Sequence, residues 1–153
     1  MNALNFDLAV EQYHQAMNGI FNGNPERMQE IFSDREDISL SNLFGPTVLG
    51  RMSVVDAIAR AAANFRDGEP AHYDNLVKVV TPELAYIVEV ERGRSRVGGN
   101  AELRSLTFRV TTIFRPEDGA WKVIHRHADP ITTLRSAESV ILKPYESHSE
   151  RTN

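Results

Sequence analysis

The 153-residue sequence contains no cysteine, so disulfide bonds, zinc–thiolate sites and cysteine nucleophiles are excluded. It also lacks any apolar run near the roughly 20 residues that a membrane-spanning helix needs, and we expect no membrane partner. Basic residues are not in excess, because the net charge is −4, which argues against a nucleic-acid partner. Residues 1–15 carry acids where a signal peptide has a basic segment and an apolar run. We therefore expect a cytoplasmic protein.

What the sequence does contain is the composition of an ordinary globular protein, with 41% hydrophobic and 25% charged residues. Its length fits one domain that can bury a substantial core. No phosphate-binding loop, dinucleotide fingerprint or nucleophile elbow occurs in the sequence. We therefore expect no cofactor.

The first 65 residues have the pattern of three helices. In residues 6–22, apolar side chains recur at helical spacing. A short second helix is expected to begin at Pro25, which suits the first helical position. Ser53 and Asp56 resemble a capping box, which predicts a third helix that ends near Phe65.

The remaining segments alternate between apolar and polar residues, as antiparallel strands do. The expected strands are residues 38–44, 73–80, 84–92, 106–114 and 120–128. Residues 93–102 are glycine-containing and charged, and predict a flexible connection, whereas Asp118-Gly119 predicts a hairpin turn. Helices followed by antiparallel strands indicate an α+β fold.

Apolar residues are expected on both faces of this sheet. The helices cover one face, and the candidates for the other face are Ile87, Ile113, Trp121 and Val123. A small domain whose sheet is apolar on both faces needs a partner on the second face. We therefore expect a homodimer that forms through the outer face of the sheet.

The sequence DGAWKVIHRHADP, residues 118–130, follows three expected helices and a bent antiparallel sheet. This pattern resembles the nuclear transport factor 2-like superfamily, in its SnoaL-like and ketosteroid isomerase-like branch. The segment is also similar to the association domain of the calcium/calmodulin-dependent kinase. The resemblance covers roughly residues 6–130.

The resemblance implies a single α+β domain over residues 1–130, with residues 131–153 as a tail that is partly ordered through residues 140–142 and frayed beyond Tyr145. Three N-terminal helices would pack on a strongly curved, mixed but mostly antiparallel sheet, and together they would form a cone with an internal, mostly apolar pocket. This superfold hosts isomerases, dehydratases, cyclases, epoxide hydrolases and non-catalytic modules, so the fold alone does not identify an activity.

Alignment of the resemblance on Asp118-Gly119 implies which strand residues point into the pocket. On the three long strands these are Ile124, Arg126 and Ala128; Phe108, Val110, Thr112 and Phe114; and Tyr86, Val88, Val90 and Arg92. His125 and His127 would lie on the opposite, dimer-facing side. A slip of one residue in strand register would exchange Arg126 for these two histidines.

Arg126 is the sharpest candidate for a functional residue. A guanidinium inside an apolar cone is costly unless it is paired, and it suits an anionic or carbonyl oxygen. The alternative is a salt bridge within the domain, to Asp129 or to a carboxylate on the first helix. Tyr13 and Tyr86 can each offer a hydroxyl to a ligand, or can be ordinary core aromatics with a polar tip.

A metal site is the less favoured interpretation of the terminal cluster. His125, His127 and Asp129 have the residue types of a two-histidine, one-carboxylate site. No strong ligand spacing such as HExxH occurs in the chain, however. We interpret the two histidines as residues of the sheet surface or interface, and we expect no metal.

The sequence departs from the catalytic pattern of steroid isomerases. The position of their general base falls on Ser41 or Asn42, their protonated acid falls on Phe108, and their tyrosine falls near Ala16, one turn from Tyr13. None of these residues can replace a carboxylate base, so we do not expect steroid isomerisation. Dehydratase and epoxide hydrolase types need aspartates around a histidine or an arginine. The chain offers only Asp129 and Asp74 for that role.

Two functions therefore stay open. The first is a cofactor-independent isomerase, lyase or cyclase that acts on a small apolar carbonyl compound, with Arg126 and Tyr13 as catalytic groups. The second is a non-catalytic dimeric protein that binds a small carboxylate or a hydrophobic metabolite. In either case the expected ligand-binding residues are Asn42, Tyr86, Phe108, Thr112, Phe114 and Ile124.

Overall fold

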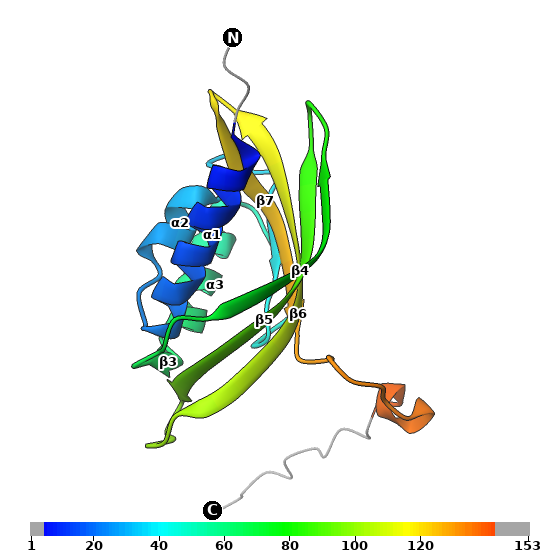
Figure 1. Cartoon of the computed structure of the whole chain (residues 1–153). Coiled ribbons are helices and arrows are strands. Elements are labelled where there is room, and N and C mark those ends of the chain that lie inside the picture. Colours follow the sequence, from blue (N-terminus) through cyan, green and yellow to red (C-terminus); the bar gives the residue numbers. More distant parts are fainter. Residues whose placement is uncertain (1–4, 143–153) are drawn as a thin grey trace, which may run out of the picture.

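The computed structural model describes residues 5–142 and places three helices against one side of a strongly curved sheet (Figure 1). The helices are α1 (Phe6–Phe21), α2 (Glu26–Ile31) and α3 (Arg51–Ala62). The strands are β1 (Ser39–Ser41), β2 (Val48–Leu49), β3 (Phe65–Arg66), β4 (His72–Val80), β5 (Ala85–Val97), β6 (Arg104–Glu117) and β7 (Ala120–Asp129). A 3₁₀ turn, η1 (Ala137–Val140), lies beyond the sheet.

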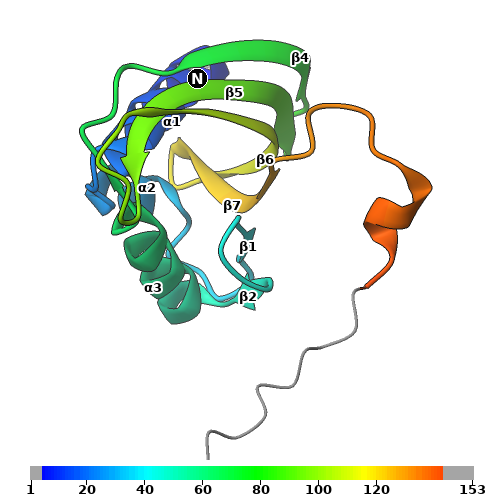
Figure 2. The same ribbon diagram turned by 90° about the horizontal axis from the view of Figure 1, so that it is seen from below.

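The sheet is built around the antiparallel meander β5-β6-β7. Its strand order is β2-β1-β7-β6-β5-β3, and β4 pairs with the first part of β5. The short strand β1 runs parallel to β7, so the sheet is mixed. Seen from below, the sheet curls into an arc that the helices close (Figure 2). The predicted α+β cone of three helices and a curved, mostly antiparallel sheet is confirmed.

The ends of the helices depend on local caps. The side chain of Asn5 accepts a hydrogen bond from the backbone of Leu8 and caps α1. The predicted capping box at Ser53 and Asp56 is wrong, because α3 already begins at Arg51, after Gly50 with a φ of 87°. It ends at Ala62, before the predicted end.

Strand β5 extends to Val97, through the first half of the segment that was predicted to be a flexible connection. Gly93 lies so close to the ring of Phe21 that a Cβ atom would be 3.3 Å from it. The hydroxyl of Ser95 donates a hydrogen bond to the carbonyl of Phe21 (2.8 Å). These contacts hold the charged segment against α1 as a strand, which its composition alone does not indicate.

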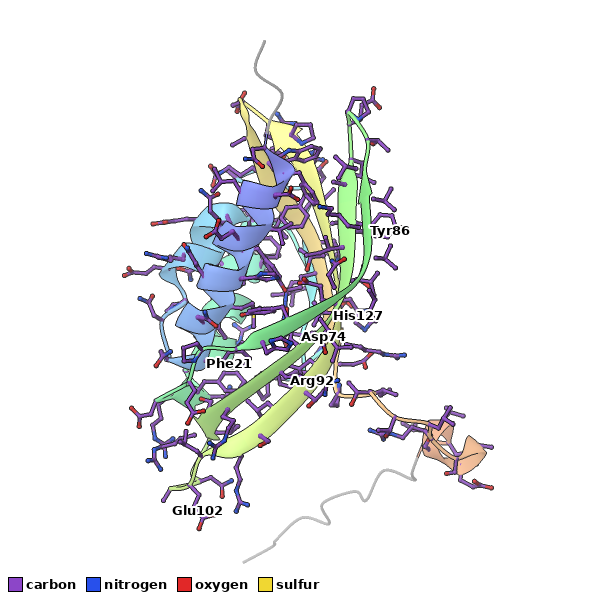
Figure 3. The ribbon with its side chains drawn as sticks, viewed as in Figure 1. Phe21, Asp74, Tyr86, Arg92, Glu102 and His127 are labelled. Atoms are coloured by element: carbon purple, nitrogen blue, oxygen red, sulfur yellow. The ribbon has the colours of Figure 1, made fainter. Side chains whose placement is uncertain are left out.

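The predicted orientation of β5 is wrong. Ile87, Glu89 and Glu91 are buried and face the helices, whereas Tyr86 and Val88 lie on the outer face. Figure 3 shows Tyr86 pointing away from the helices. Hydrophobicity favours the opposite orientation. The two buried carboxylates are nevertheless satisfied, because Glu91 pairs with Arg126 on β7 and Glu89 is hydrogen-bonded to His14 on α1.

A β-bulge changes the orientation of side chains along β7. Ile113 pairs with His125, but the next residue of β6, Phe114, pairs with Val123, so Ile124 is the additional residue. Val123 consequently faces the core, while His125 faces outward, although two-residue alternation predicted a common face.

The predicted outer surface is largely wrong. Of its four apolar candidates, Ile87 and Val123 are fully buried, and Trp121 packs edge-on against Phe6 at 5.2 Å between ring centroids. Only Ile113 lies on the outer face, next to Tyr86.

The hairpin turn at Asp118-Gly119 is confirmed, with φ values of 50° and 83° that suit a two-residue hairpin. Within residues 5–142, no helix is long and apolar enough to cross a membrane.

Candidate functional site

The cone encloses a narrow cavity of about 50 Å³ between the three helices and the inner face of the sheet. Most of its walls are apolar, and the two polar residues that line it are Asn42 and Arg126. The complete lining consists of Met17, Ile20, Phe21, Met28, Phe32, Leu40, Asn42, Leu43, Phe44, Ile58, Ala61, Phe65, Phe108 and Arg126. A volume of this size holds only a few water molecules, so a larger ligand requires the flexible side chains of Met17 and Met28 to move.

The cavity adjoins a surface depression at the loop between β1 and β2. Asn42, Phe44 and Ala61 line both spaces. Phe44 is 49% exposed, and its ring lies 5.7 Å from that of Phe65. The Phe44 side chain therefore stands between the cavity and solvent, and its displacement would open the cavity.

Arg126 belongs to a buried network that also contains Tyr13 and Glu91. Its Nε donates to the hydroxyl oxygen of Tyr13 (2.8 Å), and its Nη2 donates to Oε2 of Glu91 (2.9 Å). The Tyr13 hydroxyl in turn donates to Oε1 of Glu91 (2.6 Å). Arg126 is 8% exposed and Glu91 is 0% exposed. The three residues come from β7, α1 and β5, so the network connects three elements across the core.

The charges in this network balance. Burial alone would lower the pKa of Arg126, but the charge of Glu91 and the hydrogen bonds with Tyr13 and Glu91 outweigh burial and raise it. Burial raises the pKa of Tyr13 well above its ordinary value, despite the opposing charge of Arg126, so the phenol stays neutral. Among residues 5–142, Nη1 of Arg126 has no hydrogen-bond partner. The guanidinium therefore offers unused N–H donors from a pair whose net charge is zero.

The predicted site residues separate into three groups. Arg126, Asn42 and Phe108 line the cavity, and Tyr13 lies behind Arg126. Thr112 and Phe114 are buried on the same face, outside the cavity lining, and Ile124 packs against the core from the bulge. Tyr86 lies on the outer face, away from the cavity.

Glu91 is the residue that sequence reasoning missed. Its only sequence signal is the spacing of Glu89 and Glu91, which places two acids on one face of an otherwise apolar strand. Arg126 does form the salt bridge within the domain that was the alternative interpretation, but its partner is Glu91 on β5. Asp129, one of the partners considered, instead accepts a hydrogen bond from Nε of Arg109 (2.7 Å).

Glu89 forms a second buried acidic centre, next to α1. Its carboxylate lies 2.8 Å from Nε2 of His14, whose ring stacks on Tyr73 with 3.8 Å between centroids. The Tyr73 hydroxyl donates to the backbone carbonyl of His14 (3.1 Å) and contacts the side chain of Asn18. These bonds attach β4 and β5 to α1, and none of these residues lines the cavity.

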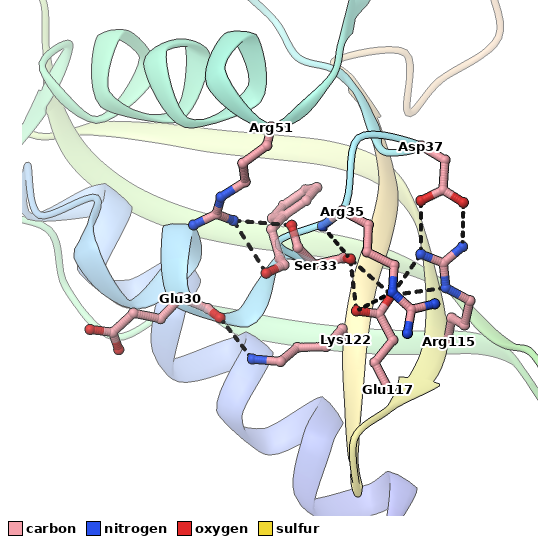
Figure 4. A network of polar contacts seen from close by, with 9 residues as sticks. Glu30, Ser33, Arg35, Asp37, Arg51, Arg115, Glu117 and Lys122 are labelled. Carbon is pink, nitrogen blue, oxygen red and sulfur yellow. Dashed lines mark hydrogen bonds and ion pairs between the residues drawn. The ribbon is translucent and has the colours of Figure 1, made fainter.

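A third polar cluster lies at the opposite end of the sheet (Figure 4). The hydroxyl of Ser33 donates to the carboxylate of Glu117 (2.8 Å), and Arg115 bridges Glu117 and Asp37. Burial alone would raise the pKa of Glu117, but hydrogen bonds from Arg115 and Ser33 outweigh it and lower the pKa. Arg51 donates to the backbone carbonyl of Gln29 in α2 and to those of Phe32 and Ser33 directly after it. The cluster fixes the loop before β1, and its polar groups are occupied by one another.

The terminal histidines lie on the outer face, as expected. His125 is 2.7 Å from the hydroxyl of Ser39, and His127 is 3.4 Å from Asp129. Burial, followed by the charge of His127, lowers the pKa of His125. Within residues 5–142, no group of three or more histidine, aspartate or glutamate side chains is arranged to hold a metal ion.

Comparison with known proteins agrees with this architecture. The family model of the SnoaL-like domain matches residues 8–132. No curated protein sequence matches the chain. Similar solved structures include a ketosteroid isomerase-like protein from Erwinia carotovora atroseptica, with 13% identity, a TM-score of 0.69 and coverage of 83% of this chain and 94% of that one.

Two other solved structures are similar over the same region. A dehydratase candidate of the NTF2-like family from Streptomyces avermitilis has 22% identity and a TM-score of 0.65, and covers 84% of this chain and 94% of its own. An NTF2-like superfamily protein from Salmonella enterica has 11% identity and a TM-score of 0.67, and the match covers 85% of this chain and 91% of that one. At these identities the likeness establishes the fold alone. The family match over residues 8–132 shows that the chain belongs to the SnoaL-like family.

Proposed function

We propose that this protein binds a small, neutral, apolar carbonyl compound in the cavity beside Arg126. The observation that carries the proposal is the ion pair of Arg126 with Glu91, at the wall of a cavity whose other lining residues are almost all apolar. A mostly apolar cavity favours a ligand with an apolar body, and the few polar groups of such a site fix the ligand's orientation. The free Nη1 donors and the amide of Asn42 suit one carbonyl oxygen.

The same pair argues against an anionic ligand. Glu91 already compensates the charge of Arg126, with 2.9 Å between Nη2 and Oε2. A carboxylate that entered the cavity would be buried without a cation of its own, and an uncompensated buried charge is costly. Of the two ligand classes that the sequence left open, this favours the hydrophobic carbonyl compound over the carboxylate.

A matched pair of ligands tests this selectivity. Cyclohexanone and cyclohexanecarboxylate have rings of the same size, and each would be titrated by NMR chemical-shift perturbation of backbone amides. We expect cyclohexanone to perturb residues around Phe108 and Ala61, and cyclohexanecarboxylate to perturb them far less. Equal or tighter binding of the carboxylate would contradict the proposed ligand class.

Two alanines on α3 and at its end provide the matched control. Ala61 lines the cavity, whereas Ala63 is exposed two residues later. Ala61→Leu fills the cavity and should weaken cyclohexanone binding at least about tenfold, whereas Ala63→Leu adds the same atoms outside it and should leave binding unchanged. If both variants bind like the wild type, the cavity is not the binding site.

A second candidate function is cofactor-independent isomerase or lyase chemistry on the same class of ligand. It is favoured by the carboxylate of Glu91, which lies directly behind Arg126 and is hydrogen-bonded to Tyr13 at 2.6 Å. In this function Arg126 would stabilise the enolate oxygen. Glu91, which is fully buried and does not line the cavity, would accept the proton from the α-carbon after the Arg126 side chain moves to expose it. Exchange of the α-protons of cyclohexanone in D₂O, followed by NMR, tests it. Exchange no faster than in buffer would rule it out, and binding without exchange leaves the first proposal intact.

We further propose that two copies of the chain pair through the outer face of the sheet. This face carries a continuous apolar set on β4, β5 and β6, formed by Val77, Val79, Tyr86, Val88, Val90 and Ile113. A soluble monomer rarely leaves such a surface uncovered. Sedimentation should therefore give a dimer at micromolar concentration, and Val88→Glu should give a monomer. A wild-type monomer at tens of micromolar would overturn this proposal. The cytoplasmic location stays a prediction.

A further inference from the structure

The segment after β7, residues 130–142, leaves the domain as an arm and makes few contacts with it (Figure 1). All of its residues are exposed. Leu134 is 102% exposed and Leu142 is 92% exposed, and Val140 and Ile141 are also largely exposed. Leaving four large apolar side chains in water on one short segment is unfavourable, so these side chains indicate a surface on another molecule.

The arm projects on the side of the sheet that faces away from the helices, which is also the side of the apolar outer face (Figures 1 and 2). It begins beside Val90 and Arg109, where residues 131–135 form a shallow groove with these two side chains. A second molecule that packs against the outer face therefore meets the arm.

A complementary exposed surface lies on the hairpin between β4 and β5. Its apolar residues on the outer face are Val77 and Val79, which pair with Val88 and Tyr86, and Leu84 is exposed at the tip. In Figure 1 this hairpin extends toward the upper end of the sheet, whereas the arm runs toward the lower end. The arm of a molecule therefore does not reach its own hairpin.

Two-fold symmetry can bring these surfaces together. Suppose that two outer faces pack together with the two-fold axis perpendicular to the long direction of the sheet. The lower end of one molecule, as seen in Figure 1, then meets the upper end of the other. Each arm then meets the partner's hairpin, and the contact forms twice. The charges also match, because Arg135 follows Leu134 on the arm and Glu83 precedes Leu84 at the hairpin tip. Neither charged residue forms an ion pair within residues 5–142.

We propose that the arm, residues 130–142, docks on the β4–β5 hairpin of a second copy of this chain. The inference rests on the proposed pairing through the outer face and adds a specific contact to it. Leu134 and the residues around η1 cover the exposed valines of the partner's hairpin, and Arg135 approaches the partner's Glu83.

Site-directed crosslinking tests the contact directly, because the natural chain has no cysteine. Leu134→Cys and isotopically labelled Val79→Cys would be prepared separately, mixed, and treated with a short bismaleimide. A covalent product containing one labelled and one unlabelled chain is expected, since the two cysteines lie on different molecules. Met52→Cys on α3 is the control, because Met52 is 79% exposed and lies far from the outer face. Its mixture with Leu134→Cys should give little product.

Sedimentation of full-length variants separates the arm from the sheet contact. Leu134→Glu should weaken dimerisation at least about tenfold, whereas Met52→Glu should not change it. A dimer that Leu134→Glu leaves at full strength, with no mixed crosslink to Val79→Cys, would overturn the arm contact while leaving the paired sheets in place. A monomeric wild type would overturn both proposals.

Discussion

Glu91→Gln is the substitution that most sharply tests the buried network. The side chain keeps its size, and the hydroxyl of Tyr13 can still donate to the amide oxygen. What changes is that Arg126, 8% exposed, loses the only carboxylate that it contacts within residues 5–142. Removing one member of a buried ion pair costs about 3–5 kcal/mol, because the remaining charge is left uncompensated. For a domain with about 5–15 kcal/mol of total stability this is a large fraction.

Urea denaturation measures the cost, with the midpoint converted at an unchanged m-value. In a thermal scan, 3–5 kcal/mol corresponds to a fall of roughly 10–20 °C for a domain of this length. The double variant Glu91→Gln/Arg126→Met removes the stranded charge and should be more stable than Glu91→Gln alone. Glu69→Gln is the exposed control, since Glu69 pairs with Arg94 at the surface, and it should change the midpoint little. A loss below about 1 kcal/mol for Glu91→Gln, or a double variant less stable than the single, would refute the reasoning.

Two further substitutions test other buried polar groups. The hydroxyl of Thr112 is buried and has no hydrogen-bond partner within residues 5–142, so Thr112→Val should leave stability unchanged or raise it by up to about 1 kcal/mol in urea denaturation. A loss above 1 kcal/mol would show that the hydroxyl is satisfied. Glu117 has a lowered pKa in the folded state because its hydrogen bonds outweigh burial. Its stabilisation is therefore present above the unfolded pKa near 4.5 and is lost as the pH falls through the folded value. Glu117→Gln should therefore lose less stability below pH 5 than the wild type does. A variant whose stability falls as steeply with pH as that of the wild type would contradict this assignment.

The position of Arg126 could be predicted because a strong local signal fixes it. Asp118-Gly119 sets the hairpin turn, and the resemblance then aligns β6 and β7 on that turn. The bulge at Ile124 could not be predicted, because its sequence contains neither glycine nor any other local signal. The inner orientation of Arg126 came from the alignment and was correct. The orientation of Val123 came from simple alternation and was wrong.

The inverted orientation of β5 has a different cause. Along this strand one face carries Tyr86 and two valines, and the other carries Ile87 and two glutamates. Local hydrophobicity favours burying the first face. The second face is buried because residues distant in sequence bind its acids: Arg126 forms an ion pair with Glu91, and His14 forms a hydrogen bond with Glu89. Such pairings depend on tertiary structure, so neither composition nor periodicity of β5 could reveal them.

The residues that shape the cavity are also residues on which the fold depends, and this determines how binding can be tested. Arg126 supplies the unused donors at the cavity wall and also compensates Glu91. Substituting Arg126 alone strands a buried carboxylate, so loss of binding in that variant would not distinguish a missing ligand contact from a disturbed core. Ala61→Leu and Ala63→Leu avoid this difficulty. The first reduces the volume of the cavity, the second adds the same atoms at the surface, and both leave the network intact. If Ala61→Leu weakens the binding of cyclohexanone and Ala63→Leu does not, the ligand occupies the cavity. The double variant Glu91→Gln/Arg126→Met then shows whether the guanidinium orients the ligand.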